Sequence, residues 1–319
     1  MAGKVSGLGD NLYVGGYDLS GDVGELSKIS GSVALLDVTP INVKAYARIG
    51  GLRDGQITYK SFFNPSAGQE HTVLSALPTA DQHMMYCRGT TLGNPAACMV
   101  EKQLEYNPSR DNKGMLTFAI QADANAFGLE WGNLLTAGLR IDTAATNGTG
   151  VDSAGGLVTP SVPASGAPVT NTSSIPVTVV ISGGTMTAVV INGVTVGTGA
   201  GTYTLPAGQS ITLTYTVAPT WTWTAVTAFG AQAYLQVTAF TGTDVTVKIQ
   251  DSADNSSFAD VTGLAFTATT AAHTTQRIAT ANNATIRRYL RVATTTSGGF
   301  TSATFAVMLT RNQVAGQVF

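Results

Sequence analysis

Three histidines, His71, His83 and His273, are the residues of this chain best suited to bind a metal or to transfer a proton. Structural metal sites gather such residues in pairs at short spacing, often together with cysteines. No histidine here has a second one at such a spacing, and the two cysteines, Cys87 and Cys98, do not form a C-x-x-C motif. The sequence therefore predicts no metal site at these residues and two buried free thiols.

Acidic and amide side chains gather over residues 250–261, where the sequence reads QDSADNSSFADV. Asp251, Asp254, Asn255 and Asp260 supply the oxygen atoms that calcium prefers, although the spacing of an EF-hand loop is absent. The same residue types build β-turns by bonding to their own backbone. The sequence favours such a turn and leaves calcium binding as the alternative.

No constellation for catalysis is present in the chain. The G-x-S-x-G, H-E-x-x-H and P-loop patterns do not occur, and the glycine-rich stretch GGYDLSGDVGE lacks the P-loop lysine. No second carboxylate stands beside Glu70 or Glu130 in the sequence to support paired-carboxylate hydrolysis. We therefore expect a protein that is not an enzyme and uses no cofactor.

Trp221 and Trp223 stand at alternate positions of the stretch TWTWTA. Side chains at alternate positions of a strand share one face, so the two rings lie together on the predicted strand. Such a face serves either as a glycan-binding platform or, more commonly, as part of a hydrophobic core. The sequence leaves both interpretations open.

The composition indicates which elements position these residues. Only 11% of the 319 residues are charged, the net charge is −2, and Thr, Val and Gly recur in short alternating segments. This pattern predicts a mainly β protein without the basic field that nucleic acids or membranes attract. The chain shows neither a signal peptide nor an apolar run long enough to span a bilayer, so we expect it to begin in the cytoplasm.

A first β-rich domain is predicted over residues 1–150. Its glycine-rich residues 1–30 indicate an extended arm that lies on a neighbouring subunit. Strands are expected over residues 43–49 and 56–63, joined by a turn at residues 53–55.

One helix is predicted in this domain, over residues 67–77. Ser66 and Gln69 have the spacing of a capping box, and Pro78 ends the apolar stripe. A long hairpin follows over residues 100–123, where alternation separates a polar from an apolar face. The apolar face would carry Val100, Leu104, Tyr106, Leu116, Phe118 and Ile120, with Lys102 as an exception.

The distribution of charged residues divides the rest of the chain into segments. No Asp, Glu, Lys, Arg or His lies between Asp152 and Asp244. We expect a linker over residues 151–174, an inserted neutral β-sandwich module over 175–224 with an Asn-Gly hairpin turn, and a further β block over 225–319. A second hairpin, predicted over residues 286–310, leaves open that this block is a diverged half of the first domain.

Three further stretches complete the layout: FGLEWGNLLTAG, AYLQVTAFTGTDVTVKIQDSADNSSFADVTG and RYLRVATTTSGGFTSATFAVMLTRN. With them the chain resembles the major tail (tail tube) proteins of long, flexible-tailed, siphovirus-type phages that infect actinobacteria. The resemblance covers residues 1–150 and 225–319. The neutral module is similar to the β-sandwich decorations that such phage proteins carry.

The resemblance implies a tail-tube-like β-sandwich or barrel with one short flanking helix. Such subunits form hexameric rings, or trimeric rings of pseudo-sixfold symmetry, which stack into the tube of a virion tail assembled in the host cytoplasm. DNA would pass through without specific binding, tape-measure, tail-terminator and tip proteins would be partners, and no membrane insertion is expected. The carboxyl-terminal block has no counterpart of the helix.

A conduit for DNA should lack cations that hold the phosphate backbone. We expect the polar face of the first hairpin to line the lumen and the amino-terminal arm to join the rings. The predicted lumen residues are Glu101, Gln103, Glu105, Thr117 and Gln121, and the predicted arm residues are Leu12, Tyr13 and Tyr17.

Two alternatives remain for the function. The chain would otherwise be a virion decoration protein or a cell-surface carbohydrate-binding β module. In either case the polar face of the hairpin would be an ordinary solvated sheet surface.

Overall fold

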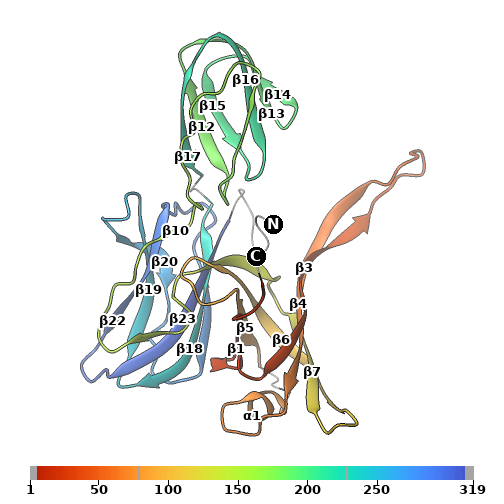
Figure 1. Cartoon of the computed structure of the whole chain (residues 1–319), viewed down its shortest axis with the longest axis vertical. Helices are drawn as coiled ribbons and strands as arrows, with labels where there is room; N and C mark the ends of the chain where they lie inside the picture. The colour runs from red at the N-terminus through yellow and green to blue at the C-terminus, as the bar shows by residue number, and fades with distance from the viewer. Residues whose placement is uncertain (1–5, 78–79, 227–228, 313–319) are drawn as a thin grey trace.

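The computed structural model describes residues 6–77, 80–226 and 229–312. Strands dominate these residues, with a single short helix among them, so the predicted mainly β fold is confirmed (Figure 1). None of the described helices has the length and apolar character needed to cross a membrane.

The described elements follow one another with short connections. In chain order they are β1 (Asn11–Val14), β2 (Tyr17–Asp18), β3 (Val23–Asp37), β4 (Arg48–Phe62), α1 (Glu70–Leu74), β5 (Gln82–Cys87), β6 (Pro95–Arg110), β7 (Leu116–Ala124), β8 (Glu130–Leu134), β9 (Arg140–Asp142), β10 (Val151–Asp152), β11 (Pro168–Thr170), β12 (Val177–Ser182), β13 (Thr185–Ile191), β14 (Val194–Gly197), β15 (Gly201–Leu205), β16 (Ser210–Val217), β17 (Thr220–Ala225), β18 (Ala231–Thr241), β19 (Val245–Ser252), β20 (Ala259–Ala265), β21 (Thr274–Ala279), β22 (Tyr289–Thr296) and β23 (Ser302–Arg311).

The largest sheet joins the two ends of the chain. Its strand order is β2-β1-β5-β6-β8-β23-β18-β21, and every neighbouring pair is antiparallel. The carboxyl-terminal strands thus continue the sheet that the amino-terminal strands begin. A cluster of buried side chains that includes Tyr13, Met85, Tyr234 and Met308 fills the junction between the two halves.

A second run of strands branches from this sheet at β6. The residues of β6 from Glu101 onward pair with β7, which pairs with β4, and β4 pairs with β3. We refer to these strands as the β3-β4-β7-β6 sheet. One of its faces packs on a core containing Ile57, Tyr59, Phe118 and Ile120, together with Leu74 of α1.

The turn predicted at residues 53–55 is wrong, because these residues lie inside β4 and pair with residues 31–33. The chain reverses between Asp37 and Arg48 instead. Glycine at position 55 allows β4 to pass close to a neighbouring loop, since a Cβ there would lie 2.6 Å from the backbone nitrogen of Leu129. Close approach, and not a turn, therefore explains this glycine.

The helix is shorter than the predicted range of 67–77, and no side-chain cap comes from within it. The carboxylate of Asp22, distant in sequence, accepts a hydrogen bond from the backbone N–H of Glu70 at 3.1 Å. This contact satisfies one of the free N–H groups of the first turn. A tertiary contact thus takes the place of the predicted capping box at Ser66.

The carboxyl-terminal block is a two-layer sandwich. Strands β10, β22, β19 and β20 form one sheet, which packs on β18, β21 and β23 over a core that includes Leu235, Ile249, Val292 and Phe305. Consecutive strands β22 and β23 lie in different sheets. The hairpin predicted over residues 286–310 is therefore wrong, and its likeness to the first hairpin does not extend to strand pairing.

Two small sheets, β11-β16-β13-β14 and β15-β12-β17, form a separate sandwich at the upper end of the molecule in Figure 1. The predicted turn at Asn192 and Gly193 joins β13 and β14, and both residues have positive φ as a type I′ turn requires. Part of the predicted linker is ordered here, because β11 belongs to this sandwich and the carbonyl of Pro160 accepts a hydrogen bond from the Trp221 ring.

Gly132 of β8 lies where this strand crosses between β6 and β23, and a Cβ there would overlap the carbonyl of Leu309. We expect Gly132→Ala to lower the free energy of unfolding by about 1–3 kcal/mol, the usual range for overpacking. Gly21→Ala is the matched control, because a Cβ at Gly21 meets no atom. Chemical denaturation of both variants checks the prediction, and equal midpoints would contradict it.

Candidate assembly surfaces

A β-bulge decides which side chains of β6 share a face. Gln103 pairs with Ala122 and Glu105 pairs with Gln121, so Leu104 is an extra residue on β6. The extra residue reverses the alternation of the strand at this point. Odd-numbered side chains before Leu104 and odd-numbered side chains after it therefore point to opposite faces of the sheet.

The predicted lumen face is consequently split. Glu105, Thr117 and Gln121 lie together on the face of the β3-β4-β7-β6 sheet that points away from the core. Glu101 and Gln103 point to the opposite side and are buried within the subunit, Glu101 at 1% exposure. Glu101 and Gln103 are thus corrections to the predicted set, and their burial excludes them from a solvent-facing wall of this chain.

The outer face is polar, and it is not free of cations. Lys28 and Lys60 of the neighbouring strands lie on it, as does Lys102, which precedes the bulge. The lysines have partners: Lys60 contacts Glu25 at 3.1 Å, Lys102 contacts Asp81 at 2.7 Å, and Lys28 donates to Gln56. The expectation of a face without Lys or Arg is wrong, but its lysines are held by neighbouring acceptors.

Both edges of this four-stranded unit are open in the single chain. Among the described residues, β3 pairs only with β4, and β6 beyond Glu101 pairs only with β7. The unpaired N–H and C=O groups of two long edge strands are templates for pairing with another chain. Pro108 on β6 limits such pairing locally, since proline has no N–H to donate.

The amino-terminal residues pack inside their own subunit. β1 pairs with β5, Leu12 and Tyr13 are buried in the core, and the ring of Tyr17 stacks on His273 with 3.7 Å between centroids. Gln236 accepts a hydrogen bond from Gly16 at 2.8 Å, so the turn after β1 is attached to the carboxyl-terminal block. These contacts overturn the prediction of an arm lying on a neighbour at these residues.

A projecting feature that the sequence analysis missed is the far end of the β3–β4 hairpin. Residues 33–52, here called the projecting hairpin, extend away from the rest of the molecule (Figure 1). They carry nine of the 22 exposed large hydrophobic side chains of the described residues. These are Val33, Leu35, Leu36, Val38, Ile41, Val43, Tyr46, Ile49 and Leu52. The sequence signal was confined to the uninterrupted apolar run at residues 33–36, because apolar and polar residues largely alternate over residues 37–49.

The two tryptophans of the neutral module are part of its core. Trp221 and Trp223 are 7% and 6% exposed and pack edge to face at 5.4 Å. The hydrophobic cluster between the two small sheets includes both rings. Their burial leaves no open aromatic platform for a glycan at this pair.

The acidic side chains near position 254 accept hydrogen bonds from other groups of the same chain. The carboxylate of Asp254 accepts hydrogen bonds from the backbone of Ser257 and Ser256 and from the hydroxyl of Ser252. These bonds lower the pKa of Asp254 to about 2. Asp251 accepts two hydrogen bonds from Arg287. In the described part of the chain, no group of three acidic, histidine or cysteine side chains is placed to hold a metal.

Two carboxyl groups are buried, that of Glu70 on α1 and that of Glu101 on β6. Ser61 donates a hydrogen bond to Glu70 at 2.6 Å, whereas the second carboxyl oxygen of Glu70 and one of Glu101 have no partner among the described residues. Burial raises the pKa of both groups to about 7. Both carboxyls therefore gain or lose a proton near neutral pH, although neither faces solvent.

Comparisons with known proteins identify no family. No protein-family model and no curated protein matches the chain. Two solved structures align with it at low similarity: the Dit protein of phage SPP1, described as a paradigm of the hub adsorption apparatus in phages infecting Gram-positive bacteria, and the baseplate of phage p2 in its activated conformation with strontium. The first has 11% identity and a TM-score of 0.25, covering 97% of this chain and 100% of that one. The second has 9% identity and a TM-score of 0.29, covering 95% and 99%. Scores this low carry no argument about function.

Proposed function

We propose that this chain is a structural protein of a phage tail that self-assembles into rings, and that the stacked rings form the tail tube. The observation that carries the proposal is the β3-β4-β7-β6 sheet, with one face on a core, one polar face and two open edges. Pairing β3 of one copy with β6 of the next would close these edges in a ring, as cyclic symmetry allows.

The polar face would then line the lumen. Its lysines are held by Glu25, Asp81 and Gln56, so few cations remain to retain a passing phosphate backbone. DNA would move through without specific binding, and tape-measure, terminator and tip proteins would contact the ends of the tube. No enzymatic activity is part of this proposal.

Six copies in a ring are the arrangement we favour over three. A trimer of pseudo-sixfold symmetry needs each chain to contain a second sheet equivalent to the β3-β4-β7-β6 sheet. The carboxyl-terminal block offers no second long hairpin, because β22 and β23 pair with other strands in separate sheets.

Electron microscopy of the purified full chain tests the proposal. We expect rings and stacked tubes with an open bore, which resist high salt because backbone hydrogen bonds join the edges. A monodisperse monomer at all concentrations would contradict it. Binding of such a monomer to cell-wall glycan would instead favour the alternative of a carbohydrate-binding surface module.

A further inference from the structure

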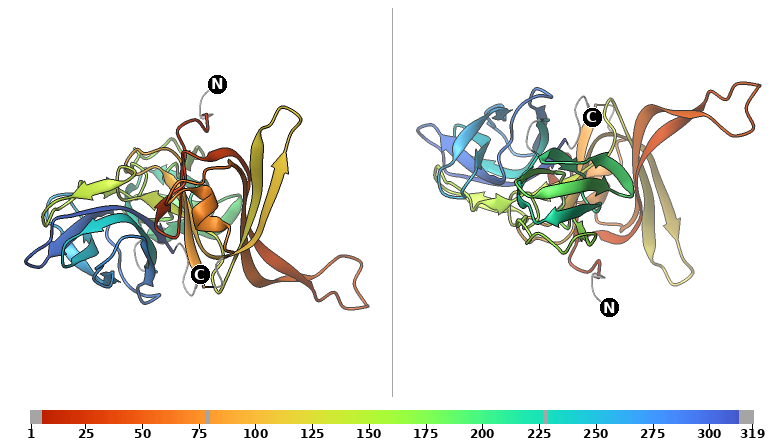
Figure 2. Two further views of the ribbon diagram at one scale, coloured as in Figure 1. Left: turned by 90° about the horizontal axis from the view of Figure 1, so that it is seen from below. Right: turned by 90° about the horizontal axis from the view of Figure 1, so that it is seen from above.

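The helix α1 packs on the core of the β3-β4-β7-β6 sheet and belongs to no sheet itself. It connects β4 to β5, and Leu74 is its buried apolar side chain. In the left view of Figure 2, from below, α1 lies at the surface of the molecule. Both β4 and β5 have sheet partners on two sides. The helix can therefore move without breaking a strand ladder.

The backbone on either side of α1 has the features of a hinge. Gly68 before the helix and Leu77 after it have positive φ values of 75° and 45°. Glycine adopts such values freely, whereas a leucine held there is strained. A cavity of about 520 Å³ borders the first hinge, where residues 67–69 line it together with Tyr17 and His273. The segment thus has a strained end and space into which it can shift.

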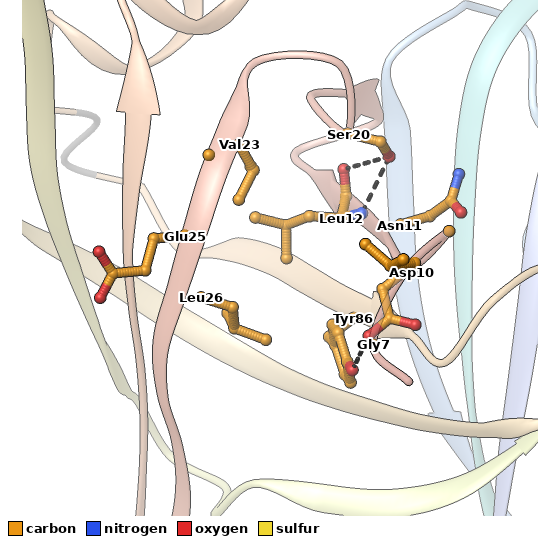
Figure 3. Close-up of a pocket in the computed structure, with 12 residues that line it drawn as sticks. Gly7, Asp10, Asn11, Leu12, Ser20, Val23, Glu25, Leu26 and Tyr86 are labelled. Carbon is orange, nitrogen blue, oxygen red and sulfur yellow. Dashed lines mark hydrogen bonds between the residues drawn. The ribbon is translucent and has the colours of Figure 1, made fainter. Parts of the chain in front are cut away.

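The group that holds the amino-terminal end of α1 belongs to a separately bound turn. Asp22 accepts hydrogen bonds from the backbone N–H of Glu70 at 3.1 Å and from the side chain of Asn64 at 2.8 Å. Its turn is attached to β1, where the backbone N–H of Leu12 donates to the hydroxyl of Ser20 at 2.9 Å (Figure 3). That contact does not involve α1. The carboxylate of Asp22 therefore stays in place when α1 moves.

The movable helix carries a buried carboxyl group beside this fixed charge. Glu70 is 0% exposed, and Ser61 donates to one of its oxygens at 2.6 Å. The other oxygen has no partner among the described residues. The titratable groups that face it from neighbouring elements are Asp22, Tyr59 of β4 and Tyr106 of β6, and none of these is a cation. An ionised Glu70 would thus be a second buried negative charge without compensation.

The proton on Glu70 decides how firmly α1 is held. Burial, with a smaller contribution from the charge of Asp22, raises the pKa of Glu70 from 4.5 to about 7 in the closed conformation. A carboxyl released into water returns to its ordinary pKa and ionises. The closed conformation is therefore most favoured below about pH 4.5, and release becomes easier as pH rises to about 7. His71, the other titratable side chain of α1, contacts Tyr106 at 3.0 Å.

We propose that α1 is a proton-operated latch, which is closed on the core while Glu70 is protonated and swings out between Gly68 and Leu77 when Glu70 ionises. Release opens the core at Leu74 and leaves the strand ladders intact. The inference goes beyond the proposed function, because it concerns one segment of the single chain and does not depend on assembly.

Hydrogen exchange of the full chain, measured by mass spectrometry from pH 5 to pH 8 and corrected for intrinsic rates, tests the latch. The backbone N–H groups of Glu70, Val73 and Ser75 are hydrogen-bonded in the closed conformation and report its opening. We expect opening of residues 69–77 to increase about 5- to 10-fold per pH unit up to pH 7, as loss of one proton requires. Opening should also exceed that of β18 and β23 at every pH.

Two variants assign the effect to one carboxyl group. Glu70→Gln keeps the size of the side chain and cannot ionise, so opening of residues 69–77 should no longer change with pH. Glu105→Gln removes an exposed carboxylate and is the matched control, which should behave as wild type. Glu101→Gln removes the other buried carboxyl, on β6, and should also keep the pH dependence of this segment.

The inference fails if residues 69–77 of the wild type exchange equally at all pH values, or if Glu70→Gln keeps the pH dependence. It fails as well if these residues are as protected as β18 and β23, because α1 would then open only when the whole chain unfolds. Loss of the pH dependence in Glu101→Gln alone would assign it to that residue and overturn the latch. Ring and tube formation is judged separately by electron microscopy, so failure of the latch leaves the proposed function standing.

Discussion

Replacing Glu130 with alanine should lower the free energy of unfolding by about 3–5 kcal/mol, the cost of breaking a buried ion pair from one side. The carboxylate of Glu130 on β8 is fully buried and accepts a hydrogen bond from Arg277 of β21 at 2.5 Å. Arg277 also lies over the ring of Phe127 at 3.7 Å and donates to the hydroxyl of Tyr234. Without the carboxylate, a buried guanidinium loses the ion pair that compensates its charge.

The location makes this pair important for the whole fold. Glu130 belongs to the amino-terminal strands and Arg277 to the carboxyl-terminal block, so the contact crosses the junction within the largest sheet. Denaturant unfolding followed by circular dichroism measures the effect, and a double-mutant cycle with Arg277→Ala isolates the coupling. Lys60→Ala, which breaks the exposed pair with Glu25, is the matched control and should leave the midpoint unchanged. An equal midpoint for Glu130→Ala would show that the pair does not join the halves.

Glu101→Gln should make the protein more stable than wild type at pH 8, by about 3 kcal/mol at 1.36 kcal/mol per pKa unit. Burial raises the pKa of Glu101 from 4.5 to about 7. The unfolded chain therefore ionises first as pH rises, and stability that is fully present below about pH 4.5 is lost as pH rises to about 7. Glutamine carries no proton to lose, so this loss disappears in the variant.

Unfolding measured at pH 4 and pH 8 checks the sign of this effect. The free energy of unfolding of the wild type should decrease from pH 4 to pH 8, and that of Glu101→Gln should decrease less. Glu70→Gln should act in the same direction, because burial raises the pKa of Glu70 to about 7 as well. Glu105→Gln removes an exposed carboxylate of the same strand and serves as the control. A Glu101→Gln variant that loses as much stability as wild type would contradict the assigned burial.

Alternation along the chain predicted the faces of β7 correctly and those of β6 only in part. Leu116, Phe118 and Ile120 do point to the core side, as the period of two requires. On β6 the pattern reverses at Leu104, where one extra residue forms a bulge. Lys102, the residue that did not fit the predicted apolar face, was the sequence signal of that reversal.

Local sequence patterns did not predict which strands, distant in sequence, pair with each other. The segments that became β22 and β23 each look like strands, and their partners lie on β19 and β18 instead of on each other. The cap of α1 comes from Asp22, far from Ser66 in sequence. Both outcomes depend on which surfaces meet after folding. They cannot be predicted from the residues that are adjacent in the sequence.

Composition and short-range chemistry determined several features by themselves: the mainly β fold, the strands of the first hairpin, the Asn192-Gly193 turn and the scarcity of charge. Each depends on backbone preferences and side-chain period, which act within a few residues. Only the tertiary structure decided that Glu101 is buried, that Leu12 and Tyr13 stay within their own subunit, and that residues 33–52 project into solvent. Burial is a property of the surfaces that pack together, so it follows from the arrangement of distant strands and not from any one of them.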